Sequence, residues 1–390
     1  MAAAEAPGKV LITADTVGGV WTHVLELAQL LGARGIEVAI AAMGDPVSAS
    51  QQAQVAALRT RRPVRLHARP LRLEWMEDPW PDLQRAGDWL LAIERQWKPD
   101  VVHLNQFAFG ALPFAAPKLV VAHSCVLSWW RAVHGKAAPS TTDRYRALVA
   151  EGLAGASLVG APTRAMLATL TQNYGYAGPG VVLPNARSPE VYAPAPKEPL
   201  VLSAGRLWDA AKNLAALESV APRLRWPVAV AGQTAQPTGG VRKPCGVRAL
   251  GELAPTALAE YLARAAIYAL PARYEPFGQS ALEAGMCGCA LVLGDIESLR
   301  EVWGRAALYV PPDDHEALHA ALQRLMGDEP LRRRMGRKAM ARAALYSPKR
   351  MTDAYLAAYA TVQEAASKES ASRRLPARMR GTSLETLCAS

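Results

Sequence analysis

The sequence lacks any hydrophobic run long enough to cross a membrane. It has 390 residues, of which 51% are hydrophobic and 20% charged, the balance of a globular chain. No apolar stretch reaches the roughly 20 residues that a spanning helix requires. Residues 1–15 show no charged start followed by a long apolar stretch and a cleavage site. We therefore expect no export signal and a cytoplasmic location.

Metal-binding patterns are missing too. The five cysteines are scattered, and Cys287-Gly-Cys289 has neither zinc spacing nor a second pair to complete four ligands. No Asp-x-Asp pair stands at an expected strand end, and Asp313-Asp314 is interpreted as the start of a helix. We expect reduced, partly buried thiols and no metal site.

What the sequence has in excess is positive charge. The net charge is +10, and residues 58–73 contain six arginines and no acidic residue. No RNA-binding aromatic motif, zinc finger or helix-turn-helix signature accompanies this charge, so we expect no nucleic-acid partner. A phosphate on a small ligand would explain the excess. Weak association with an anionic membrane surface would explain it equally well, and would place the chain at the periphery of the inner membrane.

The first half of the chain alternates short apolar strands with helical patterns. A strand at 10–14, a glycine turn, a helix at 20–34 and a strand at 36–41 form a βαβ unit, the building block of parallel sheets. Further strands are expected at 101–104, 119–122, 157–160 and 181–183.

The same pattern restarts after a proline-rich segment at 188–199. Strands are expected at 200–204, 228–231, 247–250, 267–270, 290–293 and 307–310, with helices at 213–220, 278–287, 316–326, 330–345 and 348–366. We therefore expect two doubly wound α/β domains, at 1–190 and 191–346. A C-terminal helix at 347–366 should pack back on the first domain, and a basic, disordered tail should occupy 367–390. Such sheets bind ligands at the carboxyl ends of their strands, which points to the cleft between the domains.

The segment 275–284 (EPFGQSALEA) follows an expected strand and opens a helix near Gly278. Amides of a first helical turn lack internal partners and suit anions or sugar hydroxyls. Pro276 stiffens the approach, and Gly278 lets a ligand come close to the backbone. Glu275 and Glu283 can accept hydrogen bonds from paired hydroxyls of ribose or hexose. An ordinary helix start with acidic residues fits the same pattern equally well.

A second segment, 203–213 (SAGRLWDAAKN), runs from the end of a strand into a helix. Arg206 and Lys212 can neutralise a diphosphate leaving group, one as a planar fork and the other as a point charge. Two solvated surface cations are the alternative interpretation of this segment alone.

The two segments together resemble the donor site of family 4 retaining glycosyltransferases. The resemblance lies in two glutamates separated by seven intervening residues, with Pro-Phe-Gly after the first and Leu-Glu-Ala at the second, and in Gly-Arg-Leu … Lys-Asn. It extends over residues 9–365 and implies the GT-B fold, with two Rossmann-like doubly wound domains facing a central cleft. It also implies roles: Arg206 and Lys212 clamp the diphosphate, Glu275 holds the sugar and Glu283 the ribose. Sugar or phosphate oxygens would contact the amides of Phe277, Gly278 and Gln279.

The resemblance also gives roles to residues of the first half. The turn 16–20 is not a GxGxxG fingerprint, and a tight turn that needs glycine is its simpler reading. In the family, however, a glycine loop here closes on the diphosphate, which makes Gly18 and Gly19 candidates. His123, at a strand end, matches the family's histidine beside the donor sugar, whereas a lone histidine is more often structural. His103 and Asn105 are expected on the acceptor side.

Two further features are ambiguous. Trp75, Trp80, Trp129 and Trp130 can stack on acceptor sugars or touch a membrane, but core packing is the favoured interpretation. Asn185 matches the family's interdomain Pro-Asn-Gly, except that Ala186 replaces the glycine.

The resemblance implies a retaining, metal-independent hexosyltransferase without a cofactor. The expected co-substrate is a nucleoside diphosphate sugar, with a UDP-sugar favoured over a GDP-sugar. The expected acceptor is a hydroxyl of a saccharide or lipid-linked saccharide, in polysaccharide or glycolipid synthesis. Two alternatives stay open: a nucleotide-sugar epimerase on the same fold, and a non-catalytic protein that binds anions or membranes.

Overall fold

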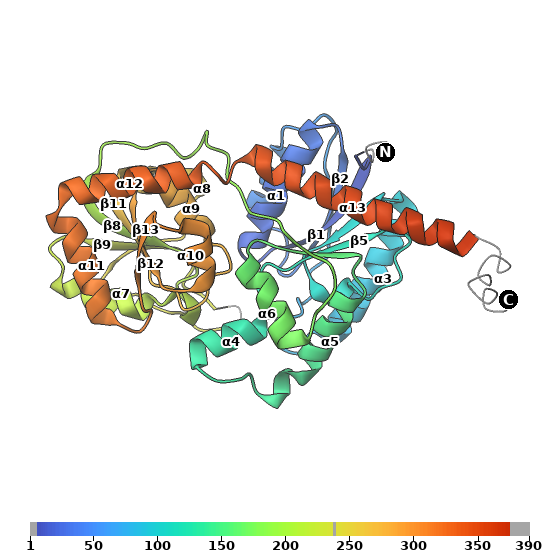
Figure 1. Cartoon of the computed structure of the whole chain (residues 1–390), viewed down its shortest axis with the longest axis horizontal. Helices are drawn as coiled ribbons and strands as arrows, with labels where there is room; N and C mark the ends of the chain where they lie inside the picture. Colours follow the sequence, from blue (N-terminus) through green and yellow to red (C-terminus); the bar gives the residue numbers. More distant parts are fainter. Residues whose placement is uncertain (1–5, 237–238, 375–390) are drawn as a thin grey trace, which may run out of the picture.

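The computed structural model describes residues 6–236 and 239–374. These residues form two domains, each a parallel sheet covered by helices on both faces (Figure 1). The first sheet has the strand order β3-β2-β1-β4-β5-β6-β7 and the second the order β10-β9-β8-β11-β12-β13. In each domain the chain first adds strands on one side of its first strand, β1 or β8, and then on the other side, as in doubly wound sheets. The expected fold class is confirmed.

The first domain contains seven strands and six α-helices of the described chain. The strands are β1 (Lys9–Asp15), β2 (Glu37–Met43), β3 (Arg65–Ala68), β4 (Val101–Leu104), β5 (Lys118–Val121), β6 (Leu158–Ala161) and β7 (Gly180–Val182). The helices are α1 (Gly19–Ala33), α2 (Ala49–Ala56), α3 (Trp80–Trp97), α4 (Val126–His134), α5 (Asp143–Ala154) and α6 (Arg164–Tyr174). Short 3-10 turns lie at Phe107–Phe109 and Ser140–Thr142.

The edge strand β3 is absent from the strands expected from the sequence. Its residues read Arg-Leu-His-Ala, with both ends exposed, so no continuous apolar run marks it. The central strands β1, β2 and β4 are buried along almost their whole length, as strands covered on both faces must be. Charged residues on an edge strand also discourage pairing with another chain. The arginine-rich segment is therefore partly a sheet edge.

The second domain contains six strands and six α-helices of the described chain. The strands are β8 (Glu198–Ala204), β9 (Val228–Ala231), β10 (Arg248–Gly251), β11 (Ala265–Leu270), β12 (Ala290–Gly294) and β13 (Ala307–Val310). The helices are α7 (Leu214–Val220), α8 (Pro255–Arg264), α9 (Gln279–Met286), α10 (Glu297–Trp303), α11 (His315–Gly327) and α12 (Glu329–Ala343). Short 3-10 turns lie at Ala210–Lys212 and Ala221–Arg223.

The last helix, α13 (Pro348–Arg374), leaves the second domain and lies across the first (Figure 1, red). It contacts α1, β4, β5 and β6. Five of its side chains are buried in the core of the first domain: Met351, Tyr355, Ala358, Tyr359 and Val362. The helix continues through Arg374, where a disordered tail was expected from residue 367. Residues 367–374 contain several good helix formers and extend a helix that packing already anchors. The rest of the expected tail lies outside the described residues.

Direct hydrogen bonds hold the two domains together beside the carboxyl edge of the second sheet. The Cys125 amide donates to the Tyr274 hydroxyl at 3.0 Å, and the Thr163 hydroxyl donates to the Pro276 carbonyl at 3.1 Å. The carboxylate of Glu301 accepts from two amides of the first turn of α6, at 2.8 and 3.0 Å. A carboxylate at a helix N-terminus is favoured by the helix dipole. The loops that follow β8 and β11 therefore face the first domain.

Candidate active site

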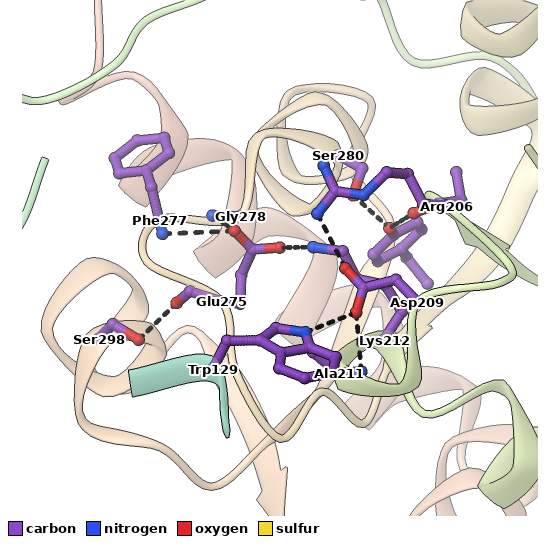
Figure 2. A network of polar contacts seen from close by, with 12 residues as sticks. Trp129, Arg206, Asp209, Ala211, Lys212, Glu275, Phe277, Gly278, Ser280 and Ser298 are labelled. Atoms are coloured by element: carbon purple, nitrogen blue, oxygen red, sulfur yellow. Dashed lines mark hydrogen bonds and ion pairs between the residues drawn. The ribbon is translucent and has the colours of Figure 1, made fainter. Parts of the chain in front are cut away.

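An ion pair lies where the loops after β8 and β11 meet (Figure 2). Lys212 Nζ contacts Glu275 Oε2, and Glu275 Oε1 accepts from the Gly278 amide at 2.9 Å. Both side chains are largely buried. Burial opposes ionisation of the Glu275 carboxyl, but Lys212 and the two amides of Phe277 and Gly278 outweigh it and hold the pKa below its usual range. Glu275 is therefore an ionised group fixed at the start of α9.

The backbone around this pair explains why these residue types are used. Gly278 has φ +90°, a conformation that L side chains avoid, and it turns the chain from Glu275 into α9. Asn213 also has a left-handed backbone, at φ +58°, which asparagine tolerates. Its side-chain amide donates to the Pro271 and Pro312 carbonyls at 2.9 and 2.7 Å. Asn213 thereby ties the Lys212 loop to the neighbouring strand ends.

A second ion pair, between Arg206 and Asp209, lies in the second domain and is contacted by the first domain through Trp129. Arg206 Nη2 donates to Asp209 Oδ2 at 2.8 Å, and the indole of Trp129 on α4 donates to Asp209 Oδ1 at 2.9 Å (Figure 2). The Ala211 amide also donates to Oδ1, at 3.0 Å. Burial tends to raise the pKa of Asp209, but Arg206 and Lys212 lower it below its usual range. Trp129 therefore belongs to the domain interface, close to a phosphate-binding candidate.

The glycine turn after β1 lies against both of these loops. Gly18 has φ +110°, and a Cβ added there would lie 3.0 Å from Arg206 Nη1. A Cβ on Gly19 would lie 3.7 Å from the side-chain oxygen of Gln279. The structure thus brings Gly18, Gly19, Arg206 and Gln279 together from segments far apart in the sequence.

Glu283 lies on α9 and is paired with an arginine that the sequence did not single out. Arg187, on the linker between the domains, donates from Nε to Glu283 Oε1 at 2.7 Å and from Nη2 to Gln279 Oε1. Arg187 and Glu283 are 4% and 7% exposed, so this is a buried pair. Burial tends to lower the pKa of Arg187, but Glu283 raises it above its usual range. A cation two residues after Asn185, in the expected hinge, was the available signal.

Phe277 and Gln279 differ in what they can offer to a ligand. The Phe277 side chain is 2% exposed and packs edge to face on Tyr346, with ring centroids 5.2 Å apart. Only its backbone amide is a candidate contact, and that amide already donates to Glu275 Oε1 at 3.4 Å. Gln279 presents a side chain that is already bound to Arg187.

His123 follows β5 and is held by Asn105. Its Nε2 lies 2.7 Å from Asn105 Oδ1, while Asn105 Nδ2 donates to the Thr13 carbonyl at 2.6 Å. The Thr13 carbonyl can only accept, so it fixes the orientation of the amide and assigns the proton to His123 Nε2. Burial lowers the pKa of His123 to about 4. At neutral pH the ring is therefore uncharged, with Nδ1 as its acceptor.

The two residues expected on the acceptor side are directed into the protein. His103 is fully buried, and its Nδ1 lies 3.0 Å from the Tyr359 hydroxyl. Asn105 is 9% exposed, and its amide is used by Thr13 and His123. His103 offers no exposed atom to an acceptor, and Asn105 instead orients His123.

The sequence did not single out two buried carboxyl groups of the first domain, Asp15 and Glu74. Asp15, the last residue of β1, accepts from the Val17 amide at 2.6 Å, and Glu74 accepts from the amides of Phe107 and Ala108. Burial raises the pKa of each to about 7, against the effect of these amides. Neither residue belongs to a motif, so only the position of Asp15 at a strand end could have indicated it. A carboxyl group that titrates near neutrality is suited to proton exchange.

The ambiguous tryptophans separate into different environments. Trp75 is 38% exposed, and its indole is one of the groups that act on the Asp15 carboxyl. Trp80 and Trp130 are partly buried, and Trp80 packs against the core of the first domain. The favoured interpretation, core packing, holds for Trp80 but not for Trp75.

No group of three or more histidine, cysteine or acidic side chains is placed to hold a metal ion within residues 6–236 and 239–374. In the same part of the chain, no helix combines the length and apolar character needed to span a membrane. Cys125, Cys287 and Cys289 are buried free thiols, and Cys245 is exposed.

Solved structures of glycosyltransferases share this architecture. Sucrose-phosphate synthase from Thermosynechococcus elongatus superposes with a TM-score of 0.71 at 19% identity, over 94% of this chain and 99% of that one. Anabaena HepE, solved in complex with UDP and glucose, gives a TM-score of 0.67 at 16% identity, over 93% and 99% of the two chains. The fold is therefore GT-B, with two Rossmann-like domains facing each other.

Two family models match the two halves of the chain. The model for Glycosyltransferase Family 4 matches residues 17–191, and the model for Glycosyl transferases group 1 matches residues 185–342. The chain belongs to the glycosyltransferases that these models describe, as the resemblance of its motifs predicted.

Two curated relatives match shorter segments. O-antigen chain mannosyltransferase B of Escherichia coli is 32% identical over 113 residues, which are 29% of this chain and 30% of that protein. Glycogen synthase of Mycobacterium tuberculosis is 37% identical over 97 residues, 24% of this chain and 23% of that protein. The aligned regions span less than a third of each relative's length.

Proposed function

We propose that the protein is a retaining glycosyltransferase that moves a hexosyl group from a nucleoside diphosphate sugar to a hydroxyl acceptor. The observation that carries this proposal is the convergence of Arg206, Lys212, Glu275 and the start of α9 at one sheet edge, opposite Gly18 of the other domain. Two cations beside the start of a helix suit a diphosphate, and an ionised carboxylate beside them suits sugar hydroxyls.

The cations act on the leaving group. As the bond from the sugar to the diphosphate breaks, negative charge develops on the phosphate oxygens, and Arg206 and Lys212 stabilise it. Both cations are already oriented, Arg206 by Asp209 and Lys212 by Glu275. Preoriented charges need little reorganisation during the reaction, which favours the transition state over the ground state. The reaction then needs no metal ion and no cofactor besides the nucleotide sugar.

A retaining transfer without a protein nucleophile requires a substitution on one face of the sugar. Both oxygens of Glu275 are engaged, one by Lys212 and the other by the start of α9. We therefore propose a same-face substitution, in which a phosphate oxygen of the departing diphosphate takes the proton of the acceptor hydroxyl. His123 orients the sugar: its Nε2 proton is used by Asn105, which leaves Nδ1 to accept from a sugar hydroxyl.

The relatives favour particular substrates. One is named for mannosyl transfer to a polysaccharide chain, another for glycogen synthesis, and one structure holds UDP and glucose. These names support a hexose donor, a UDP-sugar before a GDP-sugar, and a saccharide or lipid-linked saccharide acceptor. With a lipid-linked acceptor, the basic surface would hold the protein weakly at the inner face of an anionic membrane.

The test begins with thermal-shift measurements on UDP-, GDP- and ADP-sugars. A ligand present at 100 times its Kd stabilises the folded state by about 2.7 kcal/mol, which moves the melting temperature measurably. The stabilising donor is then incubated with saccharide acceptors, and NMR reports the anomeric configuration of the product. The proposal expects a product with the configuration of the donor. An inverted product would contradict the mechanism.

Other outcomes point to the alternatives. Isomerisation of the donor without an acceptor would identify an epimerase. Binding to anionic vesicles, with neither transfer nor hydrolysis of any donor, would identify a non-catalytic binding protein. Transfer that requires a divalent cation and stops with a chelator would overturn the metal-independent step.

A further inference from the structure

Five polar aromatic side chains, His123 and four buried neighbours, form a cluster in the first domain. They are His23 on α1, His103 on β4, His123 after β5, and Tyr355 and Tyr359 on α13. We refer to these five residues as the imidazole–phenol cluster. Only His123 has a role in the proposed function, and no motif links the other four residues to it.

Hydrogen bonds and ring contacts connect the cluster throughout. His23 Nε2 lies 3.0 Å from the Tyr355 hydroxyl, and His103 Nδ1 lies 3.0 Å from the Tyr359 hydroxyl. The rings of His23 and His123 meet edge to face, with centroids 4.7 Å apart. The His103 ring stacks on Tyr355 at 5.3 Å. Each phenol of α13 is thus bound to an imidazole of the first domain.

The cluster is uncharged, and its four residues other than His123 are buried. Tyr355, Tyr359 and His103 are 0% exposed and His23 is 1% exposed. Burial lowers the pKa of His23 well below its ordinary value and that of His103 to about 3. Burial also raises the pKa of both tyrosines above their ordinary range. At neutral pH the five groups are therefore neutral, and they are held by directional hydrogen bonds and ring packing.

Apolar packing alone would not require such residues. Buried polar groups cost stability unless each finds a partner, and phenylalanine or leucine would fill the same space without that requirement. Even here one ring atom, His103 Nε2, has no partner among the described residues. Burying these polar atoms therefore costs stability. Unlike apolar side chains, they form directional hydrogen bonds that fix how the rings are oriented.

Two neighbouring side chains fix the orientation of the His123 ring. Asn105 holds its Nε2 at 2.7 Å, and the His23 ring packs against it on another side. His23 is in turn fixed by Tyr355, which comes from the far end of the chain. If α13 shifted, His23 would lose its partner and His123 would lose one of its supports.

We propose that α13 is a functional part of the donor site, with Tyr355 acting through His23, and Tyr359 through His103 and the stacked Tyr355 ring, to position His123. The proposal rests on the proposed function of His123 beside the transferred sugar. Tyr355, Tyr359, His23 and His103 are positioning residues, since none of them needs to touch the substrate.

The test uses Tyr355→Phe and Tyr359→Phe, which each remove one hydroxyl and keep the ring. Misplacing a catalytic group by about 1 Å can cost on the order of 100-fold in rate. With one support of several removed, we expect kcat to fall about 5- to 20-fold in each variant, with KM for the donor within about 2-fold. The matched control is Thr352→Val, which removes another buried hydroxyl of α13, one bonded only to the Pro348 carbonyl.

A second measurement reports the position of His123 directly. Long-range ¹H–¹⁵N NMR of the histidine side chains detects the Nε2 proton of His123, assigned with His123→Gln. We expect this resonance to move in Tyr355→Phe and to stay in place in Thr352→Val. An unmoved resonance, or kcat losses equal to those of Thr352→Val at equal thermal stability, would overturn the proposal. Should the wild-type protein transfer no sugar, the proposed function fails, and the NMR comparison still decides whether α13 positions His123.

Discussion

The two sides of the cleft differ in the charge of their candidate residues. On the side of the second domain, the candidate residues are charged and paired: Lys212 with Glu275, Arg206 with Asp209, and Arg187 with Glu283. On the side of the first domain, His123 and the groups that support it are neutral and hydrogen-bonded to one another. Buried groups occur on both sides, among them the Arg187–Glu283 pair and His103, so burial alone does not explain the difference.

The difference matches what each side must hold. Buried charges are stable only when paired, so the second domain keeps its cations oriented by carboxylates before a ligand arrives. A diphosphate can then compete for donors that already point toward it. A neutral imidazole accepts from a hydroxyl without attracting an anion, which suits a sugar. In the proposed mechanism, the charged side holds the leaving group and the neutral side orients the transferred sugar.

The largest effect should come from breaking a pair on the charged side. Arg187→Met leaves the Glu283 carboxylate buried without its partner, and we expect unfolding in urea to require about 3–5 kcal/mol less than in the wild type. The double variant Arg187→Met/Glu283→Leu replaces both charges by apolar groups and should recover most of that loss. If Arg187→Met were as stable as the wild type, water would have to reach the Glu283 carboxylate, and the pair would not be buried.

Arg206→Ala removes a cation from the proposed diphosphate site. By analogy with the loss of one oxyanion donor, kcat at saturating donor should fall about 100- to 1000-fold. The control is Arg264→Ala, which removes an arginine of the same domain that pairs with Glu198 on the surface. Steady-state kinetics of both variants decide the point: wild-type turnover in Arg206→Ala would remove this residue from the mechanism.

Asp15 is the exception on the neutral side, and its pH dependence sharpens the comparison. Burial raises its pKa to about 7, so the folded chain binds this proton more tightly than the unfolded chain. Between about pH 4 and pH 7 the group therefore makes the wild type less stable as pH rises. Asp15→Asn keeps an acceptor for the Val17 amide and cannot ionise.

We accordingly expect the stability of Asp15→Asn, relative to wild type, to increase from about pH 4 to pH 7, by about 4 kcal/mol in total, and then to level off. Urea unfolding at several pH values measures this difference. A difference that is constant with pH would show that Asp15 is ionised throughout, and that the first domain also presents a charge to the cleft.

The smallest effect is expected where the two sides meet. Trp129→Phe keeps the ring but removes the indole N–H that reaches Asp209 from the first domain. A typical hydrogen bond to a charged group contributes about 1.5–3 kcal/mol, and Asp209 retains Arg206 and the Ala211 amide, so we expect kcat to fall only about 3- to 10-fold. Trp130→Phe on the same helix is the control. Identical kinetics in the two variants would mean that Trp129 does not couple the domains.

The same contrast explains how much of the molecule could be predicted. Apart from Arg187, the charged side derives from two continuous segments, 203–213 and 275–284, and the sequence therefore indicates most of its candidate residues. The alternation of apolar strands and helical patterns likewise predicts both parallel sheets, because strands covered on both faces must be apolar.

The neutral side is assembled from residues with no common pattern. His23, His103 and His123 lie on three different elements, and their phenol partners lie on the last helix. Each alone resembles an ordinary core residue, so only the three-dimensional fold brings them together. Arg187 and Asp209 were missed for a related reason: their function is to hold another side chain, and such a partner is visible only in the folded structure.

The return of α13 to the first domain also determines when the protein becomes competent during its synthesis. Domains generally fold as units while the chain is being made, at about 5–20 residues per second. The strands of the first sheet are complete at Val182, yet part of its core, including Tyr355 and Tyr359, is made only after the whole second sheet. A nascent chain that has made both sheets but not α13 still exposes an apolar face and lacks the partners of His23 and His103. The supports that we propose for His123 are therefore complete only after α13 has emerged from the ribosome.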